Sequence, residues 1–249
     1  MQTDILFYPA IATIAALYAS VGHGGASGYL AIMSLYGYSP QAAAPSALLL
    51  NLFVAAVAFT AYWRAGHLRM RLFWPFAVTS IPMAYLGARF TVAPAVYSAM
   101  LACALTWAAT RLLRNPSREK IPQDHFTMPP QATALTCGAG IGLVSGMVGV
   151  GGGIFLSPLL ILRRWADTKQ TAAVSALFIW ANSASGLLGH YSRQSAAAFD
   201  LWPLAVAAVV GGAAGSWLGT ERLQSPALKK ILGVVLLIAA IKSVLNIWT

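Results

Sequence analysis

The sequence predicts an all-α, polytopic membrane protein built from two copies of one unit. Of the 249 residues, 58% are hydrophobic and only 9% are charged, whereas soluble domains are usually about one quarter charged. The apolar residues form blocks of membrane length, and a helical span needs about 20 residues. A membrane β-barrel would instead show alternating segments of about 10 residues, and the sequence shows none.

Segment 1–20 carries Asp4 and lacks a basic stretch, so we expect it to remain in the mature protein rather than act as a signal peptide.

Three blocks of sequence occur twice at a nearly constant spacing. The stretch "VGHGG" (21–25) recurs as "VGVGG" (148–152), 127 residues later. Likewise "AAPSAL" (43–48) recurs as "AAVSAL" after 129 residues, and "LFWPFAV" (72–78) as "DLWPLAV" after 128 residues. Separate blocks with the same spacing indicate an internal repeat.

The repeat divides the chain into two copies joined by a polar, Pro-rich linker. We expect repeat 1 at 1–113, a cytoplasmic linker at 114–130 and repeat 2 at 131–249. Each copy is predicted to hold one segment broken at its glycines, followed by three spans. In repeat 1 these are 8–36, then 41–63, 73–90 and 94–113; in repeat 2 they are 131–163, then 168–190, 201–219 and 226–246.

The 16 Lys and Arg residues favour one of two topologies. If each broken segment crosses the membrane, the chain has eight spans and parallel repeats, and the cations divide 9 to 7. If each broken segment is a re-entrant hairpin, the repeats are inverted, and only Arg89, Arg193 and Lys242 lie apart from the other 13. The positive-inside rule favours the second division. The half-segments 8–20 and 24–36 are about 20 Å long as helices, too short to cross alone.

The two glycine-rich breaks are predicted to form an anion site near the middle of the membrane. A turn between two half-helices leaves N–H groups without partners, and the second half-helix directs its positive N-terminus at the turn. Transporters with inverted repeats and broken helices bind substrates in this way. The six Asp and Glu residues fall at segment ends or in loops, which disfavours a multi-carboxylate cation carrier. Close helix packing is the structural alternative for the glycines.

The candidate substrate-binding residues follow from the breaks and from the polar residues of the helices after them. From the breaks they are Gly22, His23, Gly24, Gly25, Ala26, Ser27, Gly149, Val150, Gly151, Gly152, Gly153 and Ile154. From the following helices they are Ser46, Asn51, Ser175 and Asn182. His23 is the one ionisable residue predicted at a break, and Val150 takes its place in repeat 2. His23 is therefore the candidate for proton coupling, with a neutral structural role as the alternative.

Other functional classes find little support in the sequence. There is no GxSxG nucleophile elbow and no GxxxxGK[ST] loop, and both glycine motifs lack the last glycine of GxGxxG. The four His and two Cys residues show no metal-ligand spacing. No basic run interleaved with aromatic residues suggests nucleic-acid binding. We expect no enzymatic activity, no cofactor, no metal and no nucleic-acid partner.

The duplicated VGxGG motif and the "SAL" helix that follows each copy resemble the TauE/SafE family of membrane proteins, the sulfite and organosulfonate exporters. The resemblance covers about 14–247 and is stronger in repeat 2, "GMVGVGGGIFLSPLLIL" followed by "TAAVSALF". Repeat 1 departs at His23, Ala26 and Ser27. The resemblance implies small sulfur-containing anions such as sulfite, thiosulfate or sulfonates as substrates, and a homodimer is compatible with it.

The sequence thus leads us to expect a secondary transporter, an exporter of small anions, in a bacterial-type inner membrane. The partners are the anionic substrate and the lipid bilayer. An anion channel and a non-transporting membrane scaffold are the alternatives.

Overall fold

The computed structural model describes residues 6–90, 92–113, 127–192, 201–221 and 226–245. The regular structure within these ranges is entirely α-helical, which confirms the all-α part of the prediction. Most of the expected linker, 114–126, lies outside the described residues, as does Arg193. In chain order the first five helices are α1 (Phe7–Ala19), α2 (Ala26–Leu35), α3 (Pro40–Arg64), α4 (Met70–Arg89) and α5 (Pro94–Leu113). The others are α6 (Gln131–Val148), α7 (Gly153–Leu162), α8 (Thr168–Tyr191), α9 (Trp202–Glu221) and α10 (Pro226–Leu245).

The chain is interrupted between α1 and α2 and again between α6 and α7, at the two glycine motifs. The first break lies after Ala19 and the second after Val148. Five glycines of the breaks have φ between 75° and 99°: Gly22 and Gly25 in the first break, and Gly149, Gly151 and Gly152 in the second. Residues with a Cβ rarely adopt this left-handed region. The glycines therefore allow the chain to leave one helix and start the next within a few residues.

Each broken pair of helices returns to the end of the molecule from which it started. At the beginning of α1, the Phe7 ring lies 4.9 Å from Tyr36 and 6.0 Å from Tyr38, both beyond the end of α2. Just before α6, the Thr127 N–H donates to the Arg164 carbonyl, beyond the end of α7, at 3.3 Å. The arms differ in length, since α1 has 13 residues and α6 has 18. At 1.5 Å per residue α6 is about 27 Å long, which by length alone is enough for a span.

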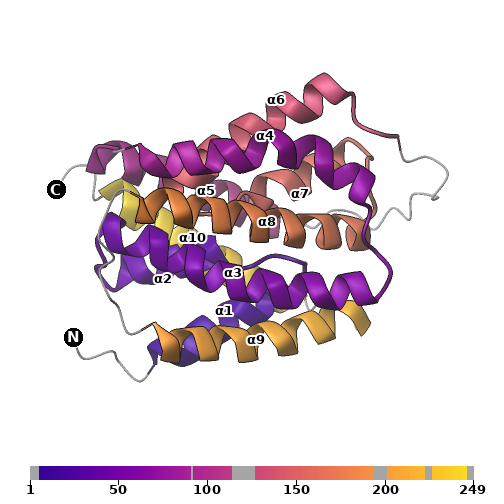
Figure 1. Cartoon of the computed structure of the whole chain (residues 1–249). Helices are drawn as coiled ribbons and strands as arrows, with labels where there is room; N and C mark the ends of the chain where they lie inside the picture. Colours follow the sequence, from indigo (N-terminus) through magenta and orange to yellow (C-terminus); the bar gives the residue numbers. More distant parts are fainter. Residues whose placement is uncertain (1–5, 91, 114–126, 193–200, 222–225, 246–249) are drawn as a thin grey trace.

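Helices from opposite halves of the chain pack against one another along their length. Helix α3 lies against α8 at the centre, α4 against α6, and α1 against α9 (Figure 1). Glycines of α6 meet the α4 backbone: Gly138 at Phe76, Gly142 at Ser80 and Gly146 at Ala84. Glycines of α9 meet the α1 backbone in the same manner: Gly211 at Ala12, Gly215 at Ala16 and Gly219 at Ser20. Both pairs therefore run parallel, at the close approach that glycines every fourth residue permit.

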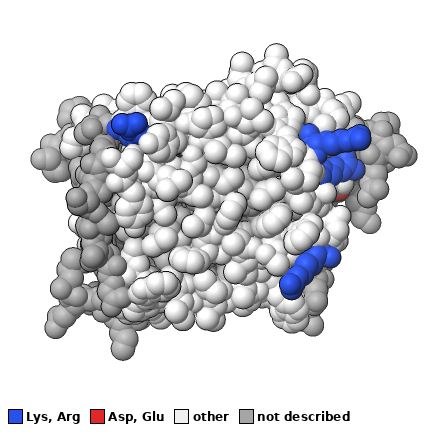
Figure 2. All heavy atoms as spheres, viewed as in Figure 1, with Lys and Arg blue, Asp and Glu red and all other residues white. Residues whose placement is uncertain are grey.

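The surface consists of a broad uncharged band between two ends. Helices of span length and apolar composition are found at Ala42–Arg64, Gln131–Val148, Thr168–Tyr191 and Trp202–Thr220. Large apolar side chains on α9, including Trp202, Val206 and Val210, are more than half exposed. Figure 2 shows Lys and Arg gathered mainly at the end where α3 meets α4 and α7 meets α8. Exposed apolar side chains between charged ends are what a lipid environment requires.

Candidate functional site

Asn51 lies between the two glycine-rich breaks. Its amide occupies the space that a Cβ on Gly24 or on Gly151 would need. The Asn51 Oδ1 accepts from the Ala26 N–H at 3.2 Å, and its Nδ2 donates to the Ser183 Oγ at 2.8 Å. The residue is 1% exposed and stands near the middle of α3. One side chain therefore connects the first break, the second break and α8, halfway along the long central helices.

The N–H groups of the two breaks are partly used inside the protein and partly left over. Those of Gly22, His23, Gly149 and Val150 donate to backbone carbonyls, and that of Ala26 donates to Asn51. Within the described residues, seven further N–H groups of the breaks donate to no protein acceptor: those of Gly24, Gly25, Ser27, Gly151, Gly152, Gly153 and Ile154. They belong to the turns and first residues of α2 and α7, where helices carry unpaired donors and partial positive charge.

Three carbonyl groups at or beside the breaks accept hydrogen bonds from tyrosine hydroxyls. The Tyr62 hydroxyl donates to the Ser20 carbonyl at 2.8 Å, that of Tyr29 to the Gly24 carbonyl at 2.8 Å, and that of Tyr97 to the Val148 carbonyl at 3.2 Å. The carbonyls of five further break residues accept from no donor among the described residues: Gly22, His23, Gly149, Val150 and Gly151. What favours an anion is therefore the group of seven open N–H donors at two helix N-termini, where the partial charge is positive.

His23 connects the first break to the second half of the chain through two serines. Its Nδ1 lies 3.1 Å from the Val21 carbonyl, its Nε2 lies 3.0 Å from the Ser157 Oγ, and that Oγ lies 2.8 Å from the Ser175 Oγ. A carbonyl only accepts, so the proton of a neutral ring belongs on Nδ1, and Nε2 accepts from Ser157. Protonation of Nε2 would make it a donor to Ser157, which frees the Ser157 hydroxyl hydrogen to donate to Ser175.

The remaining candidates occupy different positions. The Ser27 hydroxyl bonds with that of Tyr18 at 2.7 Å. Ser46 is buried, and Val150 and Ile154 belong to the apolar core. Asn182 is also buried, but its amide accepts from Ser80 at 2.7 Å and donates to the Phe178 carbonyl at 2.8 Å. The hydrogen bonds of Asn182 therefore go to α4 and to its own helix, not to the breaks.

Sequence reasoning did not find Ser157, Ser183 or the three tyrosines. Ser183 follows Asn182 directly, and the "NSAS" run marks this turn of α8 as polar without saying which residue faces Asn51. Ser157 stands one turn into α7, before Pro158, where Leu30 stands in repeat 1 at the spacing of 127. A comparison of the two copies for polar residues present in only one of them would have identified Ser157.

Comparisons with known proteins agree with one another. The family model described as Sulfite exporter TauE/SafE matches residues 7–243. The chain is 38% identical over 236 residues to the probable membrane transporter protein y4hK of Sinorhizobium fredii (strain NBRC 101917 / NGR234), covering 92% of this chain and 93% of the relative. It is 28% identical over 267 residues to probable membrane transporter proteins of Xylella fastidiosa strains Temecula1 and 9a5c, covering 95% of this chain and 98% of each relative. No solved structure matches the chain significantly.

Proposed function

Since the chain belongs to the Sulfite exporter TauE/SafE family of membrane transporters, we propose that it is a secondary transporter that exports small sulfur-containing anions from the cytoplasm. Sulfite, thiosulfate and organosulfonates are the substrates to expect. The observation that carries the proposal is the meeting of two glycine-rich breaks around Asn51, with seven backbone N–H groups open.

The proposed site holds the anionic head of the substrate between the two breaks. The N–H groups of Gly24, Gly25 and Ser27 donate from one side, and those of 151–154 donate from the other. The Asn51 Nδ2 group adds a donor between them. Ser175 supplies a hydroxyl, which is held in place by its hydrogen bond to Ser157. No cation is needed in such a site, because helix N-termini and backbone amides bind oxyanions on their own.

The proposed topology is two inverted repeats, each with a re-entrant hairpin and three spans. Three observations support it. Each broken pair returns to its own end of the molecule, the corresponding long helices α3 and α8 run in opposite directions (Figure 1), and loops 66–69 and 167–170 lie side by side. With eight full spans, those two loops would lie on opposite faces of the membrane. The cation-rich end is then cytoplasmic.

Alternating access in this proposal is a movement of one repeat against the other. Each break packs against the long helix of the opposite repeat: Gly22 lies against Ala172 of α8, and Gly149 lies against Ala44 of α3. The bond from Asn51 to Ser183 also joins the repeats. A rocking motion has to break and remake these contacts, which opens the space between the breaks to one side at a time.

His23 is the proposed proton-coupling residue. Its ring is the ionisable group at the breaks, and it reaches across the repeats to Ser157. A proton on His23 changes the charge beside the anion and reverses the direction of the His23–Ser157 hydrogen bond, so it can favour one arrangement of the repeats over the other.

Flux measurements in proteoliposomes test this function. Purified protein should transport at least one of sulfite, thiosulfate and a sulfonate with saturation kinetics, and it should not transport cations or sugars. Flux that rises linearly with anion concentration would indicate the channel instead. Saturable transport of cations or sugars without any anion transport would contradict the proposal.

A further inference from the structure

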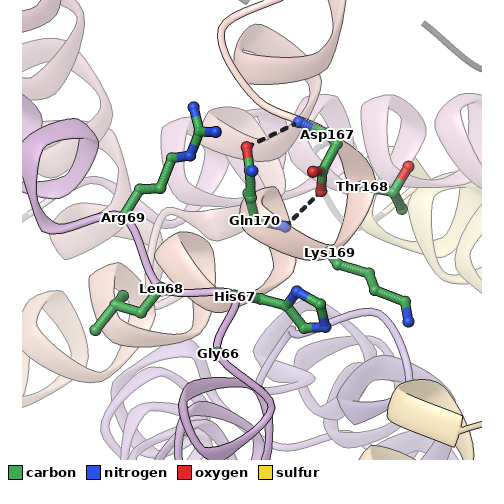
Figure 3. Close-up of a pocket in the computed structure, with 8 residues that line it drawn as sticks. All are labelled: Gly66, His67, Leu68, Arg69, Asp167, Thr168, Lys169 and Gln170. Carbon is green, nitrogen blue, oxygen red and sulfur yellow. Dashed lines mark hydrogen bonds between the residues drawn. The ribbon is translucent and has the colours of Figure 1, made fainter. Parts of the chain in front are cut away.

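A hollow opens on the cation-rich end of the molecule, between the loop that joins α3 to α4 and the start of α8. Its volume is about 620 Å³, and its wall is formed by Gly66, His67, Leu68, Arg69, Asp167, Thr168, Lys169 and Gln170. Figure 3 shows the two segments facing each other, one from each half of the chain. Most of the lining residues are exposed or half-buried, so the hollow is open to the surface.

The charge of this hollow favours an anion. Its one carboxylate, Asp167, caps α8: it accepts from the Gln170 N–H at 2.8 Å, while the Gln170 Oε1 accepts from the Asp167 N–H at 3.4 Å. Arg69 and Lys169 have no ion-pair partner among the described residues, and both are exposed. The hollow therefore presents two cationic groups, while its carboxylate is engaged in capping the N-terminus of α8.

The floor of the hollow adjoins the first break. Leu68 packs with Tyr62, Ala172 and Ala173 in a small apolar cluster. Gly22 lies against the backbone of Ala172, and the Tyr62 hydroxyl bonds to the Ser20 carbonyl. One layer of side chains thus separates the hollow from the glycine turn.

Polar side chains on α8 continue from the hollow toward the breaks. Thr168 lines the hollow, Thr171 follows one turn deeper, and Ser175 follows one turn below that. Residues three and four apart share a helix face. The Thr171 Oγ1 is buried and has no hydrogen-bond partner within the part of the chain that the structure describes. Ser175 is bonded to Ser157, which is bonded to His23. A buried hydroxyl without a partner is uncommon, and it lies between the hollow and the serine chain.

We propose that this hollow is the cytoplasmic entry site of the transporter, in which Arg69 and Lys169 bind the anionic group of the substrate before it passes along Thr171 and Ser175 to the breaks. The identity of the ligand rests on the function proposed above, whereas the anion preference of the hollow rests on its own charges.

The local preference for anions can be measured without transport. In a Cys103→Ala, Cys137→Ala background, Thr168→Cys places a thiol in the wall. Its reaction rates with an anionic sulfonatoethyl and a cationic trimethylammonioethyl methanethiosulfonate give a ratio that reports the local potential. We expect Arg69→Gln with Lys169→Gln to lower the anionic-to-cationic ratio at least tenfold.

The matched control is Arg163→Gln with Arg164→Gln, which removes two exposed cations of the same end that are not in the wall. Because screening at physiological ionic strength weakens charges with distance, this pair, which lies outside the wall, should change the ratio less than the wall pair does. Equal changes for the two pairs, or no change for either, would contradict the proposed site.

A transport arm separates this inference from the proposed function. With anion presented at the cytoplasmic face, Arg69→Gln with Lys169→Gln should raise KM at least tenfold and change kcat less than threefold, and the Arg163 and Arg164 control should change neither. A fall in kcat with KM unchanged would contradict an entry role. If the wild-type protein carries no anion while the labelling ratio still depends on Arg69 and Lys169, the transport function fails and the anion preference of the hollow stands.

A lipid arm distinguishes soluble anions from headgroups, which offer similar chemistry. In phosphatidylcholine nanodiscs, thiosulfate or a sulfonate should slow labelling of Thr168→Cys in a saturable manner. If labelling of Thr168→Cys slows only when phosphatidylglycerol is included, the two cations bind lipid headgroups. That result would contradict the entry role.

Discussion

Asn51 is the residue on which the geometry of the site depends most. It accepts from Ala26 in the first break, fills the space beside Gly151 in the second, and donates to Ser183 of α8. Asn182, at nearly the same depth and equally buried, directs its amide to Ser80 and Phe178. Two buried asparagines in similar surroundings therefore offer a matched comparison.

We predict that Asn51→Asp lowers anion transport at least a hundredfold. The aspartate keeps an acceptor for the Ala26 N–H and can accept from the Ser183 hydroxyl, so the local hydrogen bonds have a replacement. Its negative charge, however, lies where the anion is proposed to bind, and a hundredfold loss corresponds to about 2.8 kcal/mol, within the cost of opposing like charges. Transport is measured per correctly folded protein in proteoliposomes.

Asn182→Asp serves as the control for this substitution. It places the same charge in α8, against Ser80 rather than beside the open N–H groups, so we expect less than a tenfold loss. Equal losses in the two variants would mean that the charge acts through stability and not through the site.

His23 gives a second prediction at this scale. His23→Gln retains a polar group that can reach Ser157 but removes the ionisable ring. We expect transport to persist within about tenfold and to lose its response to an imposed proton gradient. Flux is measured with and without a pH difference across the vesicle membrane. A variant that responds to the gradient as the wild-type protein does would exclude His23 from coupling.

At the scale of helices, the parallel pairs α4 with α6 and α1 with α9 depend on glycine-to-backbone contact. A Cβ on Gly142 would overlap the backbone of Ser80, whereas a Cβ on Gly140, in the same helix, would meet nothing within 4 Å. The same substitution at these two positions therefore tests close packing against helix propensity.

We predict that Gly142→Ala destabilises the protein by about 1–3 kcal/mol, the usual cost of overpacking. Gly140→Ala should be neutral or stabilising by up to about 1 kcal/mol, since alanine is the better helix former. Unfolding by sodium dodecyl sulfate in mixed micelles measures both variants. The interface would be wrong if the two substitutions had the same effect.

The helical class and the positions of the breaks can be predicted from the sequence. Apolar blocks of membrane length predict helices, and a glycine motif that occurs twice predicts where they break. The family resemblance is confirmed by a model that matches residues 7–243. The hydrogen-bond partners across the breaks could not be predicted from the sequence, because Asn51 and Ser183 are 132 residues apart. Asn182 and Ser183 are both buried in α8, so the apolar pattern could not decide which of them faces Asn51.

For the whole molecule, the proposed inverted topology predicts which loops face the cytoplasm. In the cysteine-free background, Ala65→Cys and Thr168→Cys should be labelled by an impermeant reagent from the cytoplasmic face. Ala93→Cys and Ser192→Cys should be labelled from the other face. All four positions are exposed. Eight full spans with parallel repeats would instead group position 65 with 192 and position 93 with 168, so this single pattern separates the two arrangements.

The two breaks are proposed to form the substrate site together, and glycine substitutions at their centre test this in the proteoliposome assay. Leucine at position 24 or 151 would displace Asn51 and fill the space between the breaks. Gly24→Leu and Gly151→Leu should each abolish saturable anion transport while membrane insertion is retained, and Gly140→Leu, which points into open space, should transport like the wild-type protein. Full activity in both Gly24→Leu and Gly151→Leu would contradict the account, because the anion would then bind elsewhere.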